Sequence, residues 1–431
     1  MEVSFRYLYE CSPFYRDKFK RAGLTPSDIR SVDDLRKIPV TLKKEYVRNQ
    51  QEHPPWGNFS PVDAETRRER GWMAFASSGT TMAPRPFWHT RHDKEVWPYI
   101  NARGLWAMGV RPEDVFIICF GYGPHVGFWG IHYGAQLLGC TIIPTGGMDT
   151  KRRVSFIDWF RPTVWGGTPS YALYMGETMK EMGLDPAASA VARVVTGGEP
   201  GICVPATKRR LDALWNAKSF DFFGCTEVGM AMLGYTCEPQ AAYAEQPISP
   251  HIPEDMYIVE IVDPQTFEPL PEGERGITLV TNLYSEATCI PRYEMGDYSA
   301  ISTAPCECGR TLARAVGGLV GRADDMLLIR GLVVFPSGVE DVVRSFKELG
   351  DEFQLIVERV KELDEISVQA EPLSSVPQSD WPALQRRLAD SLRNHIGVRF
   401  SVQLVPRGTL PKTEFKAKRL KDLRRQPAGG S

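Results

Sequence analysis

The sequence predicts an α/β protein with a large N-terminal α/β domain, a β-rich subdomain within it, and a small C-terminal α+β domain. Its 431 residues exceed what one hydrophobic core usually organises, so two or more domains are expected. Apolar runs of strand length alternate with helix-length stretches up to about residue 223, which is typical of a largely parallel sheet. From residue 256 the strands are short and joined by turns, which favours a β-rich subdomain.

The elements of the N-terminal domain follow in order along the chain. Residues 5–44 mix helical and turn signals, with prolines as punctuation, and predict an N-terminal helical layer. The strands expected in the parallel sheet span residues 115–120, 141–144, 163–165, 191–196 and 219–223. The β-rich subdomain, about residues 237–320, is expected to hold strands at 256–262, 276–280 and 297–301.

A second boundary is expected near Asp324. It divides the chain into an N-terminal domain of residues 1–324 and a C-terminal domain of residues 325–431, whose size suits an independent unit. The elements expected beyond the boundary are a strand at 326–335, a helix at 338–349, strands at 354–360 and 366–371, and an amphipathic helix at 380–396.

Charge and composition exclude several classes of function. The 51 basic and 53 acidic residues give a net charge of -2, so nothing favours binding to nucleic acid or to an anionic membrane. The apolar runs fall far short of the roughly 18 residues needed to span a bilayer, and the start lacks the pattern of a signal peptide. We therefore expect a cytoplasmic protein whose nine cysteines are reduced, some of them as metal ligands.

One segment has the composition of a phosphate-binding loop. Ser77, Ser78, Gly79, Thr80 and Thr81 follow an apolar run and place four hydroxyls around a glycine. Backbone N–H groups of such a loop can close on an anion, and the hydroxyls add donors. A polar turn after a strand has the same composition, and it remains the alternative when the segment is considered alone.

Two further segments follow expected strands at their carboxyl ends, where open α/β sheets bind ligands. The first is Gly198, Glu199 and Pro200. The second contains Thr226 and Glu227, a hydroxyl and a carboxylate suited to phosphate and Mg²⁺. The alternative for the second segment is a helix N-terminus capped by the threonine, with the glutamate interacting favourably with the helix dipole.

Three segments nearer the C-terminus also carry charged residues in turns. Asp297 follows a glycine turn after Arg292, and its carboxylate can accept both hydroxyls of a ribose, although a surface turn uses the same residues. Arg322 and Asp324 precede the last domain, as a solvated linker or as a hinge. The basic run at residues 411–419 follows a proline turn, and most such runs are solvated faces.

Together, in this order and spacing, these six segments resemble the acyl-adenylate-forming superfamily, and more narrowly its phenylacetate-CoA ligase branch. The resemblance covers nearly the whole chain and includes stretches outside the nucleotide motifs, at residues 12–16, 168–171, 324–326, 330–331 and 335–336. It implies an acyl-CoA synthetase-like fold with a mobile C-terminal domain, and ATP, Mg²⁺ and coenzyme A as substrates and cofactor. The branch often forms homodimers, while the sequence itself leaves the oligomeric state open.

The resemblance also implies roles for individual residues. The loop from Ser77 to Thr81 would hold the ATP phosphates, and the loop from Gly198 to Pro200 would line the adenine side. Thr226 and Glu227 would bind phosphate and Mg²⁺. Asp297 and Arg322 would hold the ribose, Lys416 would be the mobile catalytic lysine, Asp324 the hinge, and Gly331 the residue past which pantetheine reaches the site.

Two residues depart from the family pattern. Met82 stands where a glycine usually follows the double threonine, which puts the mobility of the phosphate loop in question because methionine lacks glycine's backbone freedom. Phe415 stands where a glycine usually precedes the catalytic lysine, and it leaves Lys418 as the alternative to Lys416.

Residues 121–129 combine aromatic rings and glycines after an expected strand, a composition that fits a flat apolar ligand. By family position, Tyr122, His125 and Phe128 are the expected acyl-pocket residues. Core packing is the alternative for these rings, and it is the expectation for Trp129.

Two thiols lie close together in a predicted turn, Cys306 and Cys308, a spacing seen in metal sites although less specific than a paired C-x-x-C. Branch members that carry a cysteine and a histidine at the positions of Cys237 and His251 bind a structural zinc there. The resemblance therefore implies a Cys₃His zinc site, and buried thiols beside a surface histidine are the alternative.

The function expected from the resemblance is AMP-forming ligation of a small aryl or arylalkyl carboxylic acid to coenzyme A. Two alternatives remain open at this point. An enzyme with the same nucleotide motifs could load a carrier protein or stop at the adenylate, and a nucleotide-binding scaffold could retain a decayed ligase fold. The sequence does not name the acid.

Overall fold

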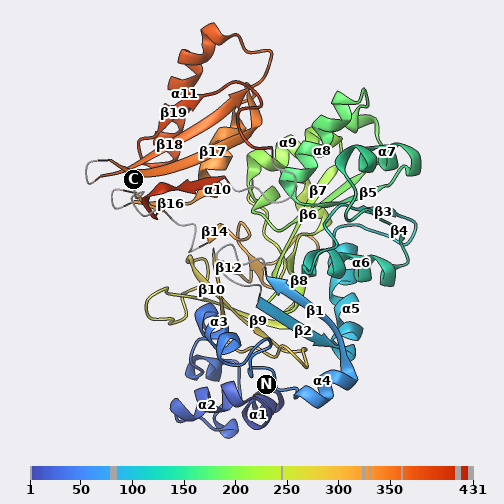
Figure 1. Ribbon diagram of the computed structural model, residues 1–431, viewed down its shortest axis with the longest axis vertical. Coiled ribbons are helices and arrows are strands. Elements are labelled where there is room, and N and C mark those ends of the chain that lie inside the picture. The colour runs from blue at the N-terminus through green and yellow to red at the C-terminus, as the bar shows by residue number, and fades with distance from the viewer. Residues whose placement is uncertain are drawn as a thin grey trace.

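The computed structural model describes residues 2–77, 85–243, 246–322, 327–329, 332–360, 363–412 and 419–425. Figure 1 shows an N-terminal helical layer, a large sheet flanked by helices, a second antiparallel sheet, and a separate C-terminal unit at the opposite end from the N-terminus. None of the helices in these ranges combines the length and apolar character required to cross a membrane.

The N-terminal layer confirms the helical expectation. Ser12 caps a helix by accepting a hydrogen bond from the Tyr15 N–H at 3.2 Å, and Pro13 occupies the first helical position. Tyr15 and Tyr46 are buried in a cluster of aromatic rings. The layer comprises α1 (Glu2–Cys11), α2 (Pro13–Arg21), α3 (Lys43–Glu52) and α4 (Ala64–Arg70).

The central sheet has six strands in the order β4-β3-β5-β6-β7-β8. The first five are parallel and β8 is antiparallel, so the prediction of a largely parallel sheet is confirmed. The strands are β3 (Val115–Ile118), β4 (Thr141–Pro144), β5 (Val164–Gly167), β6 (Arg193–Gly197), β7 (Lys218–Cys225) and β8 (Met230–Tyr235).

Helices cover both faces of this sheet, because its strands alternate buried side chains between two separate cores. Phe116 of β3 packs in one core with residues of α5 and α6, whereas Ile117 packs in the other with residues of α7, α8 and α9. The helices are α5 (Arg91–Ala107), α6 (Val126–Leu138), α7 (Thr150–Phe160), α8 (Pro169–Glu181) and α9 (Pro205–Trp215).

Two antiparallel hairpins lie beside the predicted nucleotide segments. The strands β1 (Gly71–Ser77) and β2 (Arg85–Thr90) pair on either side of residues 78–84, which the structure does not describe. The strands β7 and β8 pair through a turn in which the Gly229 N–H donates to the Thr226 carbonyl at 3.1 Å. The alternative of a helix N-terminus at Thr226 is therefore wrong, because the chain reverses into β8 instead.

The β-rich part forms a four-stranded sheet in the order β14-β11-β10-β9. Its strands are β9 (Tyr257–Val262), β10 (Gly276–Asn282), β11 (Tyr293–Ser299) and β14 (Gly321–Arg322), and a small pair is formed by β12 (Ile301–Ser302) and β13 (Arg314–Ala315). The first two expected strands are confirmed. The third expectation is wrong in its bounds, since β11 begins at Tyr293 and ends at Ser299.

The glycine turn expected before Asp297 is also wrong. Gly296 lies within β11 at φ 80, and the register between β10 and β11 shifts at this point. Glycine tolerates this left-handed conformation, which inserts a bulge into the strand. Asp297 therefore sits in the middle of a paired strand rather than at its start.

The C-terminal unit, residues 327–425, has its own hydrophobic core. The single strand expected at 326–335 is wrong, because the described residues form the antiparallel pair β15 (Leu327–Ile329) and β16 (Leu332–Val334). The expected helices are present as α10 (Pro336–Ser345) and α11 (Trp381–Ile396). A four-stranded sheet contains β17 (Leu349–Val360), β18 (Leu363–Pro372), β19 (Ser401–Leu404) and β20 (Leu420–Asp422), of which the last two were not expected.

Candidate active site

Two of the predicted nucleotide segments lie at the carboxyl edge of the central sheet. The strands β5, β6 and β7 are parallel neighbours, so the segments that follow them leave the sheet on the same side. Gly198 adopts φ 87 directly after β6, a conformation that glycine permits and that turns the chain across this edge.

The loop after β6 is fixed to the start of α8. Glu199 accepts hydrogen bonds from the Ser170 hydroxyl at 2.8 Å and from the Ser170 backbone N–H at 3.2 Å. Ser170 is in the first turn of α8, where an acidic side chain is favoured by the free N–H groups and the helix dipole. The carboxylate thus anchors the loop, and a role in binding adenine stays a prediction for Gly198, Glu199 and Pro200.

The turn after β7 carries a buried ion pair that sequence reasoning missed. Glu227 lies 3.5 Å from the Arg85 guanidinium, measured from Oε1 to Nη2, and each side chain is only 10% exposed. Burial and the neighbouring Glu227 carboxylate hold the pKa of Tyr293 well above its usual range. The sequence contained one weak signal for this pair: Arg85 is a charged residue at the start of an apolar strand, directly before Pro86 and Phe87.

Replacing Arg85 by alanine is expected to destabilise the protein by about 1–3 kcal/mol, because it leaves the Glu227 carboxylate buried without its cation. Urea unfolding measures the change in the free energy of unfolding. Arg103→Ala is the matched control, since its pair with Asp255 is 41% and 50% exposed and should contribute under about 1 kcal/mol. An equal loss of unfolding free energy in the two variants would contradict a larger contribution from the buried Arg85–Glu227 pair.

Asp297 and Arg322 are brought together by backbone pairing. They are direct partners in the register of β11 and β14, and the Asp297 side chain is buried. The N-terminal layer supports this strand, because the Thr41 N–H donates to the Arg292 carbonyl at 2.9 Å and the Glu294 N–H donates to the Thr41 carbonyl at 3.0 Å. The structure therefore places the pair on one sheet edge, while their ribose contacts stay a prediction.

The predicted acyl-pocket residues differ in exposure. Tyr122 is 38% exposed and its ring lies 3.8 Å from that of Phe128, which is 1% exposed and belongs to the core. His125 is exposed immediately before α6. Trp129 is half-buried, as expected of a core-packing ring, and meets Tyr122 edge-on at 5.3 Å. Phe128 thus packs against the Tyr122 ring, Tyr122 and His125 are the exposed pair, and an acyl-pocket role stays a prediction for all three.

Several predicted site residues lie outside the described residues. They are Ser78, Gly79, Thr80, Thr81, Met82, Asp324, Gly331, Phe415, Lys416 and Lys418. The ends of the predicted phosphate loop are placed, because Ser77 closes β1 opposite Arg85 at the start of β2. That start also provides the guanidinium that pairs with Glu227.

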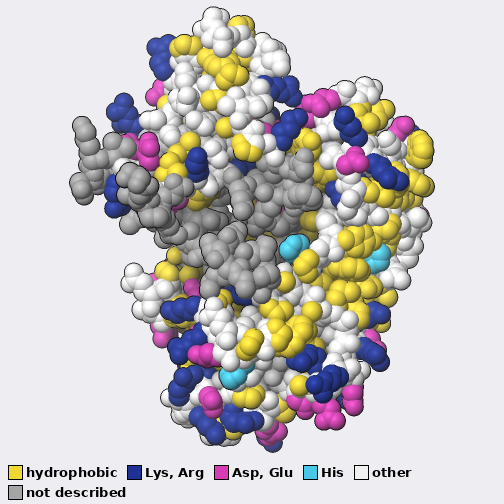
Figure 2. Space-filling model, viewed as in Figure 1, with side chains coloured by type: hydrophobic (Ala, Val, Ile, Leu, Met, Phe, Trp, Pro, Cys, Tyr) yellow, Lys and Arg dark blue, Asp and Glu magenta, His cyan; other side chains and the backbone are white. Residues whose placement is uncertain are grey.

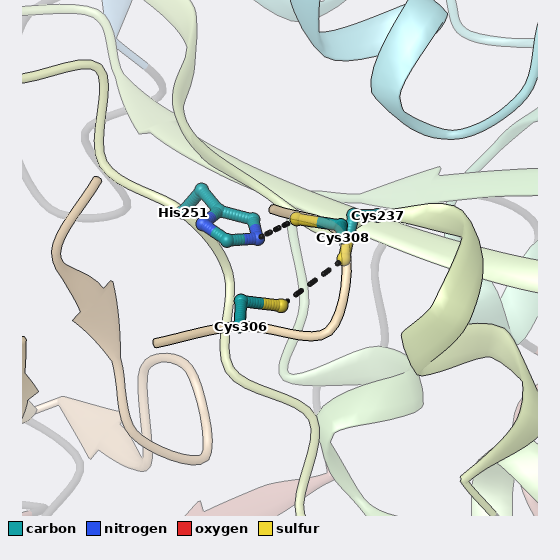
Figure 3. A group of neighbouring side chains, drawn as sticks. All are labelled: Cys237, His251, Cys306 and Cys308. Carbon is teal, nitrogen blue, oxygen red and sulfur yellow. Dashed lines mark hydrogen bonds between the residues drawn. The ribbon is translucent and has the colours of Figure 1, made fainter. Parts of the chain in front are cut away.

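A second group of side chains has the composition of a metal site. The ligand atoms of Cys237, His251, Cys306 and Cys308 all lie within 4.8 Å of one another, and Figure 3 shows them directed toward a common centre. Cys237 follows β8, His251 bridges Tyr235 and Arg314, and the other two cysteines lie between β12 and β13. Segments far apart in the sequence thus meet at one point.

The spacing of these atoms fits a tetrahedral ion. The sulfurs of Cys237 and Cys306 are 3.7 Å apart, and the Cys308 sulfur is 3.4 Å from His251 Nε2. Zinc bonds of about 2.3 Å to sulfur and 2.0–2.1 Å to nitrogen give edges of about 3.8 Å and 3.5 Å in a tetrahedron. Burial lowers the pKa of His251 to about 4, which keeps the imidazole in the neutral form that binds metals.

Comparison with known families and proteins agrees with this geometry. The AMP-binding enzyme family matches residues 27–282, and the AMP-binding enzyme C-terminal domain matches residues 331–424. A phenylacetate-coenzyme A ligase of Thermus thermophilus is 35% identical over 97% of this chain and 94% of its own. One of Escherichia coli is 34% identical over 98% of this chain and 93% of its own.

The solved structure of a 2-hydroxyisobutyryl-CoA ligase with its acyl-AMP, in the postadenylation state, has a TM-score of 0.91 at 29% identity, covering 98% of this chain and 87% of the other. The same ligase in the thioesterification state has a TM-score of 0.72, covering 98% and 88%. The chain therefore belongs to the AMP-binding enzyme family, in the branch that includes the phenylacetate-coenzyme A ligases.

Proposed function

We propose that this protein is an AMP-forming ligase that joins a small aryl or arylalkyl carboxylic acid to coenzyme A. The observation that carries the proposal is the near-full-length similarity to phenylacetate-coenzyme A ligases. The match of the whole chain to an acyl-AMP complex of another CoA ligase supports an adenylate intermediate. The exposed Tyr122 ring, supported by Phe128, favours a flat aromatic acid over a small aliphatic one.

In the first half-reaction, a carboxylate oxygen of the acid attacks the α-phosphate of ATP and pyrophosphate leaves. Charge on the phosphoryl oxygens is stabilised by groups fixed in advance. We assign this role to Lys416 and to the loop from Ser77 to Thr81, with Thr226 beside the phosphates. Asp297 and Arg322 would hold the ribose, and Glu227 would hold Mg²⁺, which would neutralise phosphate charge.

The ion pair in the structure fits this assignment of Glu227. Its carboxylate is already buried and pairs with the Arg85 guanidinium at 3.5 Å, a separation longer than an optimal charge-assisted hydrogen bond. Arg85 therefore fixes the carboxylate at the carboxyl edge of the sheet without bonding it tightly, which leaves acceptor capacity on its oxygens.

In the second half-reaction, the thiol of coenzyme A attacks the acyl carbonyl and AMP leaves. The C-terminal unit must move between the steps, since a lysine that served the first would obstruct the thiol. We assign the hinge to Asp324 and the pantetheine passage to Gly331, where the absent side chain leaves room.

Asp324→Pro is expected to spare adenylation and to slow thioester formation, because proline fixes φ at the hinge. The two half-reactions can be followed separately, as acid-dependent pyrophosphate exchange and as conversion of preformed adenylate by coenzyme A. Loss of both by the same factor would argue against a hinge at this residue.

We further propose that Cys237, His251, Cys306 and Cys308 bind one structural zinc. Three sulfurs and one imidazole nitrogen complete a tetrahedron, so no position remains open for catalysis. His251 directs Nε2 toward the sulfurs, 3.4 Å from that of Cys308, so this nitrogen is placed to bind the ion. Such an ion would join β8 to the loop between β12 and β13.

Pyrophosphate release with a panel of acids tests the proposed function. We expect release with phenylacetate- or benzoate-type acids, followed by acyl-CoA when free coenzyme A is added. Release that needs a carrier protein for acyl transfer would instead identify a carrier-loading enzyme. Nucleotide binding without release for any acid would identify a scaffold.

A further inference from the structure

Helix α9 of the N-terminal domain meets the C-terminal unit through a small set of polar contacts that the proposed function does not use. Arg210 and the Ala206 N–H lie on α9, whereas Asp341 lies on α10 and Asp351 on β17. Figure 2 shows basic and acidic side chains on both sides of the junction between the upper unit and the lobe on its right. We call the Arg210 side chain, the Ala206 N–H, Asp341 and Asp351 the latch.

Arg210 of α9 contacts three consecutive residues of β17 across the junction. Its Nη2 donates to the Leu349 carbonyl at 2.8 Å and lies 3.3 Å from Asp351 Oδ1, while its Nη1 donates to the Gly350 carbonyl at 3.3 Å. The planar guanidinium presents several donors in a fixed fork, which suits neighbouring carbonyls and a carboxylate at once. This fork can be satisfied only while β17 lies against α9.

Asp341 completes the N-terminus of α9 from the other unit. Val204 at the N-cap position has no side chain that could accept a hydrogen bond, and Pro205 occupies the first helical position. The next free donor, the Ala206 N–H, donates to Asp341 Oδ1 at 3.0 Å. A carboxylate at this end of a helix satisfies a free N–H and interacts favourably with the helix dipole. The cap of α9 therefore depends on the position of α10.

Asp351 is held in place before it meets Arg210. Arg344 of α10, which is buried, lies 3.2 Å from Asp351 Oδ1 through Nη1 and 2.7 Å from Glu340 Oε1 through Nε, and all three residues belong to the C-terminal unit. Such fixed carboxylates lose less side-chain freedom on pairing than those of exposed, flexible ion pairs. The acceptor side of the latch is therefore preorganised.

The arrangement of the two units distinguishes two states of a solved relative. The chain matches the postadenylation state of the 2-hydroxyisobutyryl-CoA ligase with a TM-score of 0.91 and the thioesterification state with 0.72, at 29% identity and 98% coverage in both cases. Both structures are of the same ligase, so the difference between the two TM-scores reflects a different arrangement of its domains. The latch contacts thus belong to a postadenylation-type arrangement.

We propose that Arg210, Asp351, Asp341 and the N-terminus of α9 form a latch that stabilises the postadenylation arrangement and opens before thioester formation. The inference rests on the proposed function, in which the C-terminal unit moves between the two half-reactions. In this account the latch sets how readily the C-terminal unit leaves, and its members are positioning residues rather than catalytic ones.

Hydrogen–deuterium exchange of the free, full-length protein tests the latch without requiring activity. Arg210→Ala is expected to speed exchange at the Ala206 amide by about tenfold, the change that corresponds to about 1.4 kcal/mol. Among the described residues, the Arg210 guanidinium bonds to β17, whereas the Ala206 amide bonds to Asp341 of α10, so faster exchange at this amide reports departure of α10 rather than a local defect. Arg103→Ala, which removes an ion pair within the N-terminal domain, is expected to leave it unchanged.

Variants of Asp341 keep the test informative if Arg210→Ala folds poorly. Asp341→Ala removes the acceptor and should speed exchange at Ala206 to a similar degree. Asp341→Asn keeps an oxygen acceptor without the charge and should have a smaller effect. Unchanged exchange at the Ala206 amide in Arg210→Ala overturns the latch. If only Asp341→Ala folds, unchanged exchange in that variant overturns it.

The half-reactions supply the second readout. Arg210→Ala should raise the ratio of thioester formation to adenylate formation by up to about tenfold, the same population shift seen by exchange. A parallel change in both rates overturns the latch. If the unmodified enzyme releases no pyrophosphate with any acid, the proposed function fails, whereas the exchange experiment still decides whether the latch exists.

Discussion

Lys416→Ala is expected to slow adenylate formation by about 10²–10³-fold, equivalent to about 3–4 kcal/mol of barrier. The cation is assigned to the phosphoryl oxygens on which charge builds as pyrophosphate leaves. Acid-dependent exchange of pyrophosphate into ATP measures this step alone. Conversion of preformed adenylate to thioester should retain most of its rate, because the lysine has left the site by then.

Lys418→Ala is the matched control for that variant. It removes the same charge two residues away. If Lys416 is the catalytic lysine, Lys418→Ala should keep the rate of pyrophosphate exchange within about threefold of that of the unmodified enzyme. The reverse outcome would move the catalytic lysine to Lys418, the alternative that Phe415 raises. Unchanged exchange in both variants would contradict a lysine in this segment.

Cys306→Ser is expected to remove bound zinc and to lower the free energy of unfolding by roughly 3–5 kcal/mol, a part of the 10–16 kcal/mol that structural zinc supplies in small peptides. The four ligand atoms converge from segments that no other covalent link joins, because all nine cysteines are free in the structure. Losing the ion would therefore separate β8 from the β12–β13 loop. Elemental analysis gives the zinc content, and urea unfolding gives the stability.

Cys11→Ser is the control for the zinc site. Cys11 is exposed on α1 and lies outside the group, so this variant should keep one zinc per chain and its stability. Freshly purified unmodified protein with less than one zinc per chain would contradict the site. So would a Cys306→Ser variant that keeps its metal.

The central sheet could be predicted from the sequence because its signal is local. Buried parallel strands appear as apolar runs such as 115–118, and β4 was expected with the bounds it has. The hairpin of β7 and β8 could not be separated from a helix N-terminus, since a threonine followed by a glutamate suits both. Which one forms is decided by the pairing of Phe222 with Tyr235 in space.

The features of the site that escaped prediction arise from contacts between distant segments. Arg85 and Glu227 are 142 positions apart by their residue numbers and meet only when the two hairpins pack together. The bulge at Gly296, which shifts Asp297 into mid-strand, depends on the register with β10. The pairing of Arg210 with Asp351 depends on the placement of an entire domain. Neither local composition nor spacing contains these relations.

The cysteine–histidine group shows the opposite case. Its composition and family position were enough to predict that Cys237, His251, Cys306 and Cys308 would converge, and the structure brings the four ligand atoms together. Metal ligands are constrained in residue type as well as in position, so they leave a trace in the sequence. An arginine that pairs with a buried carboxylate, such as Arg85, leaves a weaker trace in the sequence.

A rapid-quench experiment with a labelled aromatic acid tests whether ligation passes through an enzyme-bound acyl-AMP that coenzyme A then consumes. Enzyme is mixed with labelled phenylacetate, ATP and Mg²⁺, then chased with coenzyme A and excess unlabelled acid. We expect an enzyme-bound acyl-AMP before the chase and its conversion to labelled acyl-CoA after it. Labelled acyl-CoA without any acyl-AMP, or acyl-AMP that coenzyme A does not consume, would contradict it.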